Sequence, residues 1–281
     1  MSFIQSLNAA WSRTQSLLCV GLDPEPSKFP GALNGRADAI FEFCKTIVDA
    51  TAPYASSFKP QIAYFAAHRA EDQLEALIAH IHETHPGVPV VLDAKRGDIG
   101  STAEAYAQAL FDDLGAAAIT INPYLGGDAV EPFLRRAERG VFIVCRTSNS
   151  GAGDLQDLPV TLPSGETLPL YLAVAERVRG WNSNGNAALV AGATYPRELA
   201  ELRARFPELP MLVPGVGAQS GSLEEAARAA DNGKLAGFVI SASRAITEAA
   251  APGEDAALAA RAVALRLRDA INAALRVGTA G

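Results

Sequence analysis

The segment Asp93-Ala94-Lys95-Arg96-Gly97-Asp98 places two carboxylates and a lysine within a few residues of each other. It begins at the end of an apolar run, residues 88–93, which is typical of a strand. Side chains alternate between the two faces of a strand, so Asp93 and Lys95 are expected on the same side. A neighbouring carboxylate keeps a lysine protonated where burial alone would neutralise it. Schiff-base chemistry needs the opposite environment, so the spacing favours acid catalysis by Lys95 over imine formation.

A second group of residues could bind an anion. The segment Pro214-Gly215-Val216-Gly217-Ala218-Gln219 follows one apolar run, and Arg244 follows the next. Glycines allow a ligand to approach the backbone closely, and main-chain N–H groups with a guanidinium bind phosphate. The glycine spacing does not match the dinucleotide pattern G-x-G-x-x-G. We infer a phosphate monoester as ligand and no dinucleotide.

The elements that position these residues follow from a repeated pattern. Eight short apolar runs alternate with helical segments: residues 17–21, 54–59, 88–93, 118–121, 141–145, 188–190, 211–213 and 237–240. Their separation of about thirty residues is that of one βα unit. This pattern predicts an α/β fold, a (β/α)8 TIM barrel that forms a single domain over residues 1–281 and includes an N-terminal helix.

Three helices have local signals of their own. Ser101-Thr102-Ala103-Glu104 and Ser222-Leu223-Glu224-Glu225 match the capping box that opens a helix. The alanine-rich stretch from Asp255 to Arg276 has the composition of a closing helix.

Charged residues stand where four of the predicted strands end. Asp23 closes the first strand, Lys59 the second, Asp93 and Lys95 the third, and Arg244 follows the eighth. Each alone fits a solvated residue at the rim of a barrel. Together they predict an active site, because the active sites of these barrels lie at the carboxyl ends of the strands.

Composition excludes several other classes of protein. The chain has 281 residues and a net charge of -7, which argues against a nucleic-acid-binding surface. No apolar run approaches the roughly 18 to 20 residues of a membrane helix. The three cysteines, Cys19, Cys44 and Cys145, are widely spaced and predict buried thiols rather than a disulfide framework. We therefore expect a soluble, cytoplasmic protein with no nucleic-acid partner and no membrane association.

All four histidines fall between His68 and His85. His80, His82 and His85 lie in a stretch that also fits an amphipathic helix, where positions two apart do not share a face. We interpret this stretch as a solvated helix end and predict no metal site.

The segment from Asp93 to Thr102, with the sequence DAKRGDIGST, resembles the signature of the orotidine 5'-phosphate decarboxylase family, in its longer bacterial subfamily, type 2. It departs from the better-known D-x-K-x-H-D-I form at Arg96-Gly97, which marks the subfamily and leaves D-x-K-x-x-D-I-x-x-T intact. Further segments occur in the family's order over most of the chain: Asp23, Ser57-Phe58-Lys59-Pro60, Thr147-Ser148-Asn149, Pro214 to Gln219, and Arg244.

The resemblance implies decarboxylation of orotidine 5'-phosphate to uridine 5'-phosphate and CO₂, the last step of de novo pyrimidine synthesis, with no metal or organic cofactor. It implies that Lys95 stabilises a carbanion at C6 of the pyrimidine and protonates it, beside Asp93. The implied catalytic array is Lys59, Asp93, Lys95 and Asp98.

The resemblance also implies a set of substrate contacts and a partner. Asp98, Ile99 and Thr102 are expected to come from a second subunit, which predicts a homodimer. The other implied contacts are Asp23 and Lys59 at the ribose, Ser148 at the pyrimidine edge, Gln219 and Arg244 at the phosphate and lid, and Pro214, Gly215 and Gly217 as further substrate-binding residues.

The stretch after the fifth strand, about residues 147–168, is longer than a usual βα connection and rich in Gly, Pro, Ser and Asp. It is either a functional loop or a disordered one. We interpret its carboxylates Asp154, Asp157 and Glu166 as solvated.

Two other functions stay open. An Mg²⁺-dependent enzyme of the same barrel superfamily, such as a hexulose phosphate synthase or a keto-gulonate phosphate decarboxylase, stabilises an enediolate and needs additional carboxylate ligands. Activity in EDTA would discriminate. A non-catalytic sensor of a phosphosugar or nucleotide is the other alternative, because a fold does not fix function. A sensor has no need of Lys95 among carboxylates.

Overall fold

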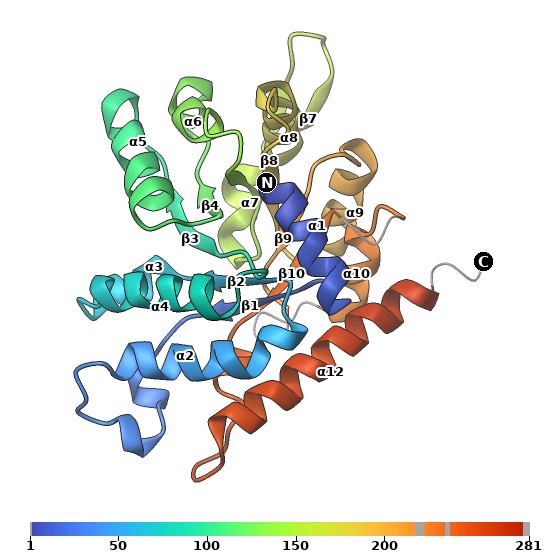
Figure 1. The fold of residues 1–281 in the computed structure, drawn as a ribbon. Coiled ribbons are helices and arrows are strands. Elements are labelled where there is room, and N and C mark those ends of the chain that lie inside the picture. Colours follow the sequence, from blue (N-terminus) through green and yellow to red (C-terminus); the bar gives the residue numbers. More distant parts are fainter. Residues whose placement is uncertain (1, 217–221, 234–236, 278–281) are drawn as a thin grey trace.

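Eight parallel strands form one sheet in the computed structural model, which describes residues 2–216, 222–233 and 237–277 (Figure 1). The strands of this sheet are β1 (Leu18–Leu22), β2 (Ser57–Pro60), β3 (Val91–Arg96), β4 (Ala118–Ile121), β5 (Gly140–Arg146), β8 (Ala187–Ala191), β9 (Met211–Val213) and β10 (Phe238–Ala242). Each of the eight predicted runs overlaps one of them.

The sheet closes on itself. Its order is β2-β1-β10-β9-β8-β5-β4-β3, and two isolated parallel bridges, Phe58 with Val90 and Gln61 with Asp93, join its two ends. The main-chain N–H of Phe58 also donates to the Pro89 carbonyl at 3.1 Å. The predicted (β/α)8 barrel is therefore confirmed.

Helices surround this barrel in Figure 1. They are α1 (Phe3–Thr14), α2 (Ala39–Thr51), α3 (Ile62–Ala67), α4 (Glu71–Thr84), α5 (Gly100–Ala107), α6 (Gly127–Leu134), α7 (Gly153–Gln156), α8 (Leu170–Trp181), α9 (Pro196–Arg205), α10 (Leu223–Ala230), α11 (Arg244–Thr247) and α12 (Ala256–Val277). The remaining helical segments are the 3₁₀ turns η1 (Pro26–Lys28), η2 (Gly31–Leu33), η3 (Ala52–Tyr54) and η5 (Ser150–Ala152), and the π-helical η4 (Gln108–Asp113).

The strands are apolar because both of their faces are covered. Every residue of β1, β4, β8 and β10 is buried, which is the usual state of a parallel sheet flanked by helices. Phe58, Phe142 and Phe238 are fully buried, and each such side chain contributes about 1.5–3 kcal/mol relative to an exposed position. The barrel therefore forms a rigid frame for the loops at its rim.

Helix α1 covers the amino-terminal end of the barrel. Its first residue, Phe3, donates its main-chain N–H to the Glu138 carbonyl at 2.9 Å and packs its ring edge-on to Phe142. A Cβ on Gly140 would meet the Phe3 ring at 2.2 Å, so the start of β5 accepts only glycine beneath this ring. The opposite, carboxyl-terminal end stays open to ligands.

The last helix confirms the predicted closing helix and packs against α2 and α10. No helix within residues 2–216, 222–233 and 237–277 is both long and apolar enough to cross a membrane.

The long stretch after β5 is folded in this structure. It contains η5, α7 and an antiparallel hairpin of β6 (Pro159–Thr161) and β7 (Thr167–Pro169), which turns through Gly165 at a positive φ of 87°. Asp154, Asp157 and Glu166 are all exposed, in agreement with the prediction of solvated carboxylates, and two of them also form ion pairs. Asp157 pairs with the buried Arg146 at 3.3 Å, and Glu166 pairs with Arg205 at 2.6 Å.

Candidate active site

A hollow of about 480 Å³ opens at the carboxyl-terminal end of the barrel. Its walls come from the ends of β1, β2, β3, β5, β8, β9 and β10 and from the loops that follow them. The lining residues are Asp23, Lys59, Gln61, Tyr64, Asp93, Lys95, Thr147, Ser148, Asn149, Val190, Pro214, Gly215, Val216, Ser241, Ser243, Arg244 and Ala245. The hollow thus brings together charged residues from strands that are far apart in the sequence.

At the bottom of this hollow, Asp93 lies between two lysines. Lys59 Nζ donates to Asp93 Oδ2 at 3.0 Å, and Lys95 Nζ donates to Asp93 Oδ1 at 2.6 Å. The Lys59 and Asp93 side chains are 6% and 10% exposed, whereas Lys95 is 47% exposed. Lys95 is therefore the most accessible member of the group.

Burial and charge act in opposite directions on this buried pair. Burial tends to raise the pKa of Asp93, but Lys59 and Lys95 outweigh it and hold that pKa well below its ordinary value. Burial tends to lower the pKa of Lys59, and the Asp93 and Asp23 carboxylates outweigh it, so that pKa is raised. Both groups are charged at neutral pH, and the site carries fixed charges before any ligand binds.

A bulge in β3 sets the position of Lys95. The register against β4 shifts between Leu92 and Arg96, and Lys95 adopts a positive φ of 45°, which is uncommon for a residue with a side chain. Thr120 on β4 holds this bulge: its Oγ1 accepts the N–H groups of Ala94 and Lys95 at 3.0 Å each, and donates to Asp93 Oδ1 at 2.8 Å. The expected proximity of Asp93 and Lys95 thus depends on this bulge as well as on the alternation of side chains along the strand.

Two buried oxygens in the wall of the hollow have no protein partner within the described part of the chain. They are Asp23 Oδ1 and Ser243 Oγ. Gly21 lets the two segments that carry them approach, because a Cβ there would meet the Ser243 Cβ at 2.7 Å. Buried polar atoms without partners are costly, and at an open hollow they are suited to bind the hydroxyl groups of a ligand.

Ser148 reaches the hollow from the loop after β5. Gln156 holds this loop, since its Oε1 accepts the Thr147 N–H at 2.9 Å and its Nε2 donates to Thr147 Oγ1 at 2.8 Å. A Cβ on Gly192 would meet the Ser148 main-chain N at 2.7 Å, so glycine is required at the end of β8. The folded stretch after β5 therefore supports one wall of the hollow.

The expected anion-binding residues are partly described. Pro214, Gly215 and Arg244 line the hollow, and Gly215 has a positive φ of 96°. Arg244 is exposed at the start of α11. Gly217 and Gln219, which the resemblance also implicates, lie outside the described residues. Of the predicted capping box before α10, the serine half is present, because Ser222 Oγ accepts the Glu225 N–H at 3.3 Å.

Asp98, Ile99 and Thr102 do not line the hollow. Asp98 Oδ1 accepts the Ile99 N–H at 2.8 Å, Thr102 is exposed, and the Ile99 side chain is 59% exposed. Within one chain, the predicted array therefore consists of Lys59, Asp93 and Lys95, and Asp98 stands apart from it.

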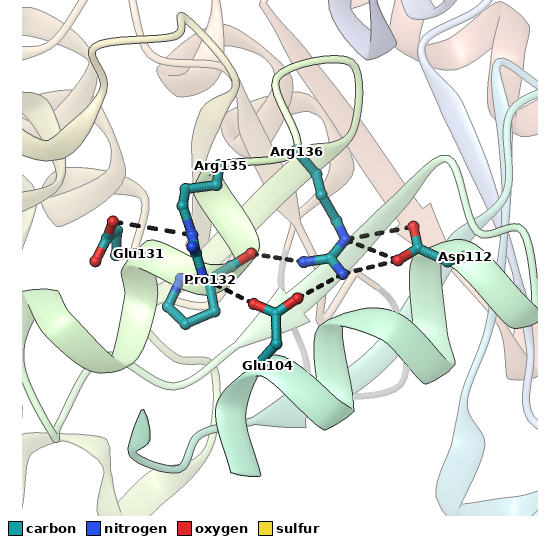
Figure 2. A network of polar contacts seen from close by, with 6 residues as sticks. All are labelled: Glu104, Asp112, Glu131, Pro132, Arg135 and Arg136. Carbon is teal, nitrogen blue, oxygen red and sulfur yellow. Dashed lines mark hydrogen bonds and ion pairs between the residues drawn. The ribbon is translucent and has the colours of Figure 1, made fainter. Parts of the chain in front are cut away.

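The helix after this segment starts one residue before the predicted capping box. Its N-cap is Ile99, with no side-chain hydrogen bond, so the capping box predicted at Ser101 and Glu104 is wrong. Glu104 instead joins the network of Figure 2, in which its two oxygens accept from Arg135 at 2.8 Å and Arg136 at 2.9 Å. Arg136 also donates to Asp112 at 2.7 Å, and the network ties α5 and η4 to the end of α6.

Sequence reasoning missed several residues of the site. Gln61 and Tyr64 line the hollow directly after β2, Thr120 holds the β3 bulge, and Gly192 makes room for Ser148. The one local signal for any of them was that Thr120 is a polar residue inside the otherwise apolar fourth strand. None of the residues that line this hollow is a histidine.

A (β/α)8 barrel with a lysine–carboxylate–lysine group and an arginine at its carboxyl-terminal end defines the class: a barrel enzyme built to act on an anionic ligand. The chain belongs to the orotidine 5'-phosphate decarboxylase / HUMPS family, whose sequence model matches residues 16–259.

Relatives match over nearly the full length. The chain is 59% identical over 274 residues to an orotidine 5'-phosphate decarboxylase of Azoarcus sp. (strain BH72), covering 97% of this chain and 99% of the relative. It is 58% identical to one of Dechloromonas aromatica (strain RCB), with the same coverage. The solved structure of Leishmania donovani OMP decarboxylase is 43% identical, with a TM-score of 0.85, and the match covers 98% of this chain and 100% of that one. The predicted family and the enzyme class, a carboxy-lyase, are confirmed.

Proposed function

We propose that this protein converts orotidine 5'-phosphate to uridine 5'-phosphate and CO₂, the final step of de novo pyrimidine synthesis. The observation that carries the proposal is the Lys59–Asp93–Lys95 group at the bottom of an open hollow. Full-length relatives named for this reaction support it.

The chemical difficulty is the electron pair left behind by CO₂. When the bond between C6 and the carboxylate carbon breaks, the pair stays on C6, where the pyrimidine ring delocalises it poorly. A fixed positive charge stabilises such a carbanion, most strongly where the surrounding dipoles are already in place. The Lys95 ammonium supplies that charge, then donates a proton to C6 and regains one from water. No metal or organic cofactor is needed for these steps.

Asp93 holds this ammonium in place. It contacts both lysines, and in our proposal it lies beside the substrate carboxylate before that group leaves as neutral CO₂. The bulge held by Thr120 keeps Lys95 directed toward the hollow. Because these charged groups are already in position before the substrate binds, the protein needs little rearrangement during the reaction.

The remaining lining residues bind the parts of the substrate that do not react. Asp23, with its unpartnered Oδ1, and Lys59 bind the ribose hydroxyls, and Ser148 contacts the pyrimidine edge. Arg244 binds the phosphate, with Pro214 and Gly215 along the same wall. From the family resemblance, we also propose Gly217 and Gln219, which lie outside the described residues, as substrate-binding residues. Binding energy from the remote phosphate then positions the base over Lys95.

The experiment is an assay of purified protein with orotidine 5'-phosphate in buffer containing EDTA. We expect rapid loss of the orotate ultraviolet absorbance, with uridine 5'-phosphate as product. No loss under these conditions, together with Mg²⁺-dependent activity on a ketose phosphate, would move the protein to the other branch of its family.

We further propose that the active protein is a homodimer that shares its sites. Asp98, Ile99 and Thr102 do not line the hollow of their own chain. Three large apolar side chains are exposed in the loops that follow the neighbouring strands β3 and β4: Ile99 at 59%, Tyr124 at 82% and Leu125 at 47%. Exposed apolar groups that lie close together are typical of an interface, and a partner bound there would receive Asp98 from this chain.

Mixing two inactive variants tests the shared site. Lys95→Ala and Asp98→Ala homodimers are each expected to be inactive. After subunit exchange, one of the two sites in a heterodimer regains both residues, so activity returns to about a quarter of the wild-type value if exchange is random. Exchange confirmed by mass spectrometry with no return of activity would contradict a site shared through Asp98.

A cytoplasmic location is part of the same proposal. The three cysteines are buried and free, which suits a reducing compartment.

A further inference from the structure

A group of side chains that could bind a metal ion lies at the amino-terminal end of the barrel, opposite the end that holds the hollow. Asp49 comes from the last turn of α2, His80 from α4, and His85 from the residue that follows α4. The Nε2 atoms of His80 and His85 lie 2.7 Å and 2.9 Å from the same oxygen, Asp49 Oδ1. The three ligand atoms lie within 4.8 Å of one another.

The end of α4 makes this convergence possible. His85 caps the helix with φ of −130° and ψ of 53°, so it leaves the helical path and its ring meets that of His80 edge-on, with centroids 6.1 Å apart. His82 remains on the helix and faces elsewhere, because its Cε1 lies 3.3 Å from the position of a Cβ on Gly115. Helical spacing keeps His82 away from the cluster, as the prediction of no metal site assumed. The same argument does not apply to His85, which lies beyond the helix, and the third residue, Asp49, comes from another helix.

The surroundings hold the ligands while leaving them accessible. The His80 and His85 side chains are 14% and 22% exposed, and Asp49 is 44% exposed. Burial tends to raise the pKa of Asp49, but hydrogen bonds from the two imidazoles outweigh it, so the pKa lies below its ordinary value and the carboxylate is charged. Phe41 packs edge-on against the His80 ring. A hollow of about 340 Å³ lies beside Asp49 and His85.

We propose that Asp49, His80 and His85 form a binding site for a divalent transition metal of the zinc class. Two imidazole nitrogens with one carboxylate oxygen match the ligands of Zn²⁺, whereas Mg²⁺ and Ca²⁺ prefer oxygen alone. Zn–N and Zn–O bonds of about 2.0–2.2 Å place the ligand atoms of a tetrahedral site about 3.4 Å apart, so the two contacts to Asp49 Oδ1 must lengthen by about half an ångström or slightly more. The ion binds at the two Nε2 atoms, each neutral ring then carries its proton on Nδ1, and water completes the coordination from the side of the hollow.

The proposed ion links α2 to the segment that leads into β3. That strand carries Asp93 and Lys95 at its other end, but no ligand of the proposed ion lines the active-site hollow. The ion therefore stabilises the fold and takes no part in the reaction, and its presence is independent of the proposed decarboxylation.

Titration calorimetry of the full chain with Zn²⁺, after removal of metals by a chelating resin, tests the proposal. We expect one equivalent to bind to the wild-type protein. His80→Ala and His85→Ala each remove one of three ligands, so each is expected to weaken binding at least about tenfold. Asp49→Asn, which keeps the side-chain shape, is expected to weaken it as well.

His82→Asn is the matched control, since it removes a histidine from the same helix without touching the cluster. We expect its Zn²⁺ affinity to equal that of the wild type. The decarboxylation rate of each variant in EDTA serves as the check that it is folded. Absence of stoichiometric Zn²⁺ binding, or an equal loss in His82→Asn and His80→Ala, would overturn the proposal.

Discussion

Two buried cations at opposite ends of the barrel show how the molecule separates function from stability. Lys59 and Arg203 are each 5% exposed. Lys59 pairs with Asp93 beside an open hollow and has a raised pKa. Burial lowers the pKa of Arg203 to about 10, which still leaves it charged at neutral pH. It forms no ion pair with any carboxylate of the described residues.

The partners of Arg203 are main-chain carbonyls. Its guanidinium donates to five of them, at the ends of α9 and α10 and before β9 and β10: Phe206, Pro207, Leu209, Ala230 and Gly237. All three of its guanidinium nitrogens thus donate within the protein, and the residue joins the connections at the amino-terminal end. Charges at that end of a barrel serve stability, whereas charges at the carboxyl-terminal end serve chemistry.

Lys95→Ala is the strongest test of the proposed chemistry at the carboxyl-terminal end of the barrel. Without the ammonium, both carbanion stabilisation and proton donation are lost, so we expect kcat to fall by at least about 10⁴-fold. Asp93 keeps its bond to Lys59, and binding of uridine 5'-phosphate is expected to remain measurable. Single-turnover assays and binding titrations measure the two effects. Near-normal turnover would exclude Lys95 from the reaction, and Lys28→Ala, an exposed lysine in η1, is the control.

Asp93→Asn is expected to reduce stability as well as activity. It leaves Lys59 buried without its nearest carboxylate, at a cost of about 3–5 kcal/mol in the free energy of unfolding at neutral pH. Because the folded-state pKa of Asp93 is lowered, this contribution is present above the ordinary carboxyl pKa of about 4 and is lost as the pH falls toward the lower folded-state value.

Urea unfolding of the wild type and the variant at a series of pH values between 7 and 2 measures this dependence. The gap between the two proteins should shrink as the pH falls below about 4. A gap that stays constant would show that Asp93 contributes through packing rather than charge. Asp154→Asn, an exposed carboxylate of α7, should give no gap at any pH.

Arg203→Met tests the structural end of the molecule. The substitution keeps much of the apolar volume but leaves buried carbonyls without donors, so we expect a loss of about 2–4 kcal/mol in the free energy of unfolding. The kcat and KM at 25 °C should stay at their wild-type values. A changed kcat with an unchanged free energy of unfolding would contradict the assignment of stability to the amino-terminal end and chemistry to the carboxyl-terminal end. Arg205→Met, two residues away, removes only an exposed pair with Glu166 and should cost less than about 1 kcal/mol.

The sequence predicts most of this architecture because each strand is buried on both faces and is therefore a continuous apolar run. Charged residues at the ends of such runs, Asp23, Lys59, Asp93 and Lys95, are then placed together by the barrel itself, and all four line the hollow. The family signature predicts the chemistry from the same residues.

Contacts between residues far apart in the sequence could not be predicted. The Ser101–Glu104 spacing matched a capping box, but Glu104 bonds instead to Arg135 and Arg136. Asp157 lies in a stretch whose composition indicated a solvated loop, yet its carboxylate pairs with Arg146 at the end of β5. Local spacing carries no information about such partners, because the folded chain decides which side chains meet.

Thr120 is the most consequential contact of this kind. Its hydroxyl holds the bulge that directs Lys95 and also contacts Asp93, although it lies on the next strand and does not line the hollow. Thr120→Val keeps the shape of the side chain but leaves two main-chain N–H groups without an acceptor. We expect kcat to fall about tenfold, on the scale of a lost hydrogen bond of about 1–2 kcal/mol.

Separate measurements of kcat and KM distinguish a positioning role of Thr120 from general destabilisation of the fold. If Thr120 acts through Lys95, the variant loses kcat with little change in KM, and Thr120→Ser, which keeps the hydroxyl, recovers most of the rate. Equal activity in Thr120→Val and the wild type would show that the bulge keeps Lys95 in position without this hydroxyl. The chemical end of the barrel would then depend on its ion pairs alone.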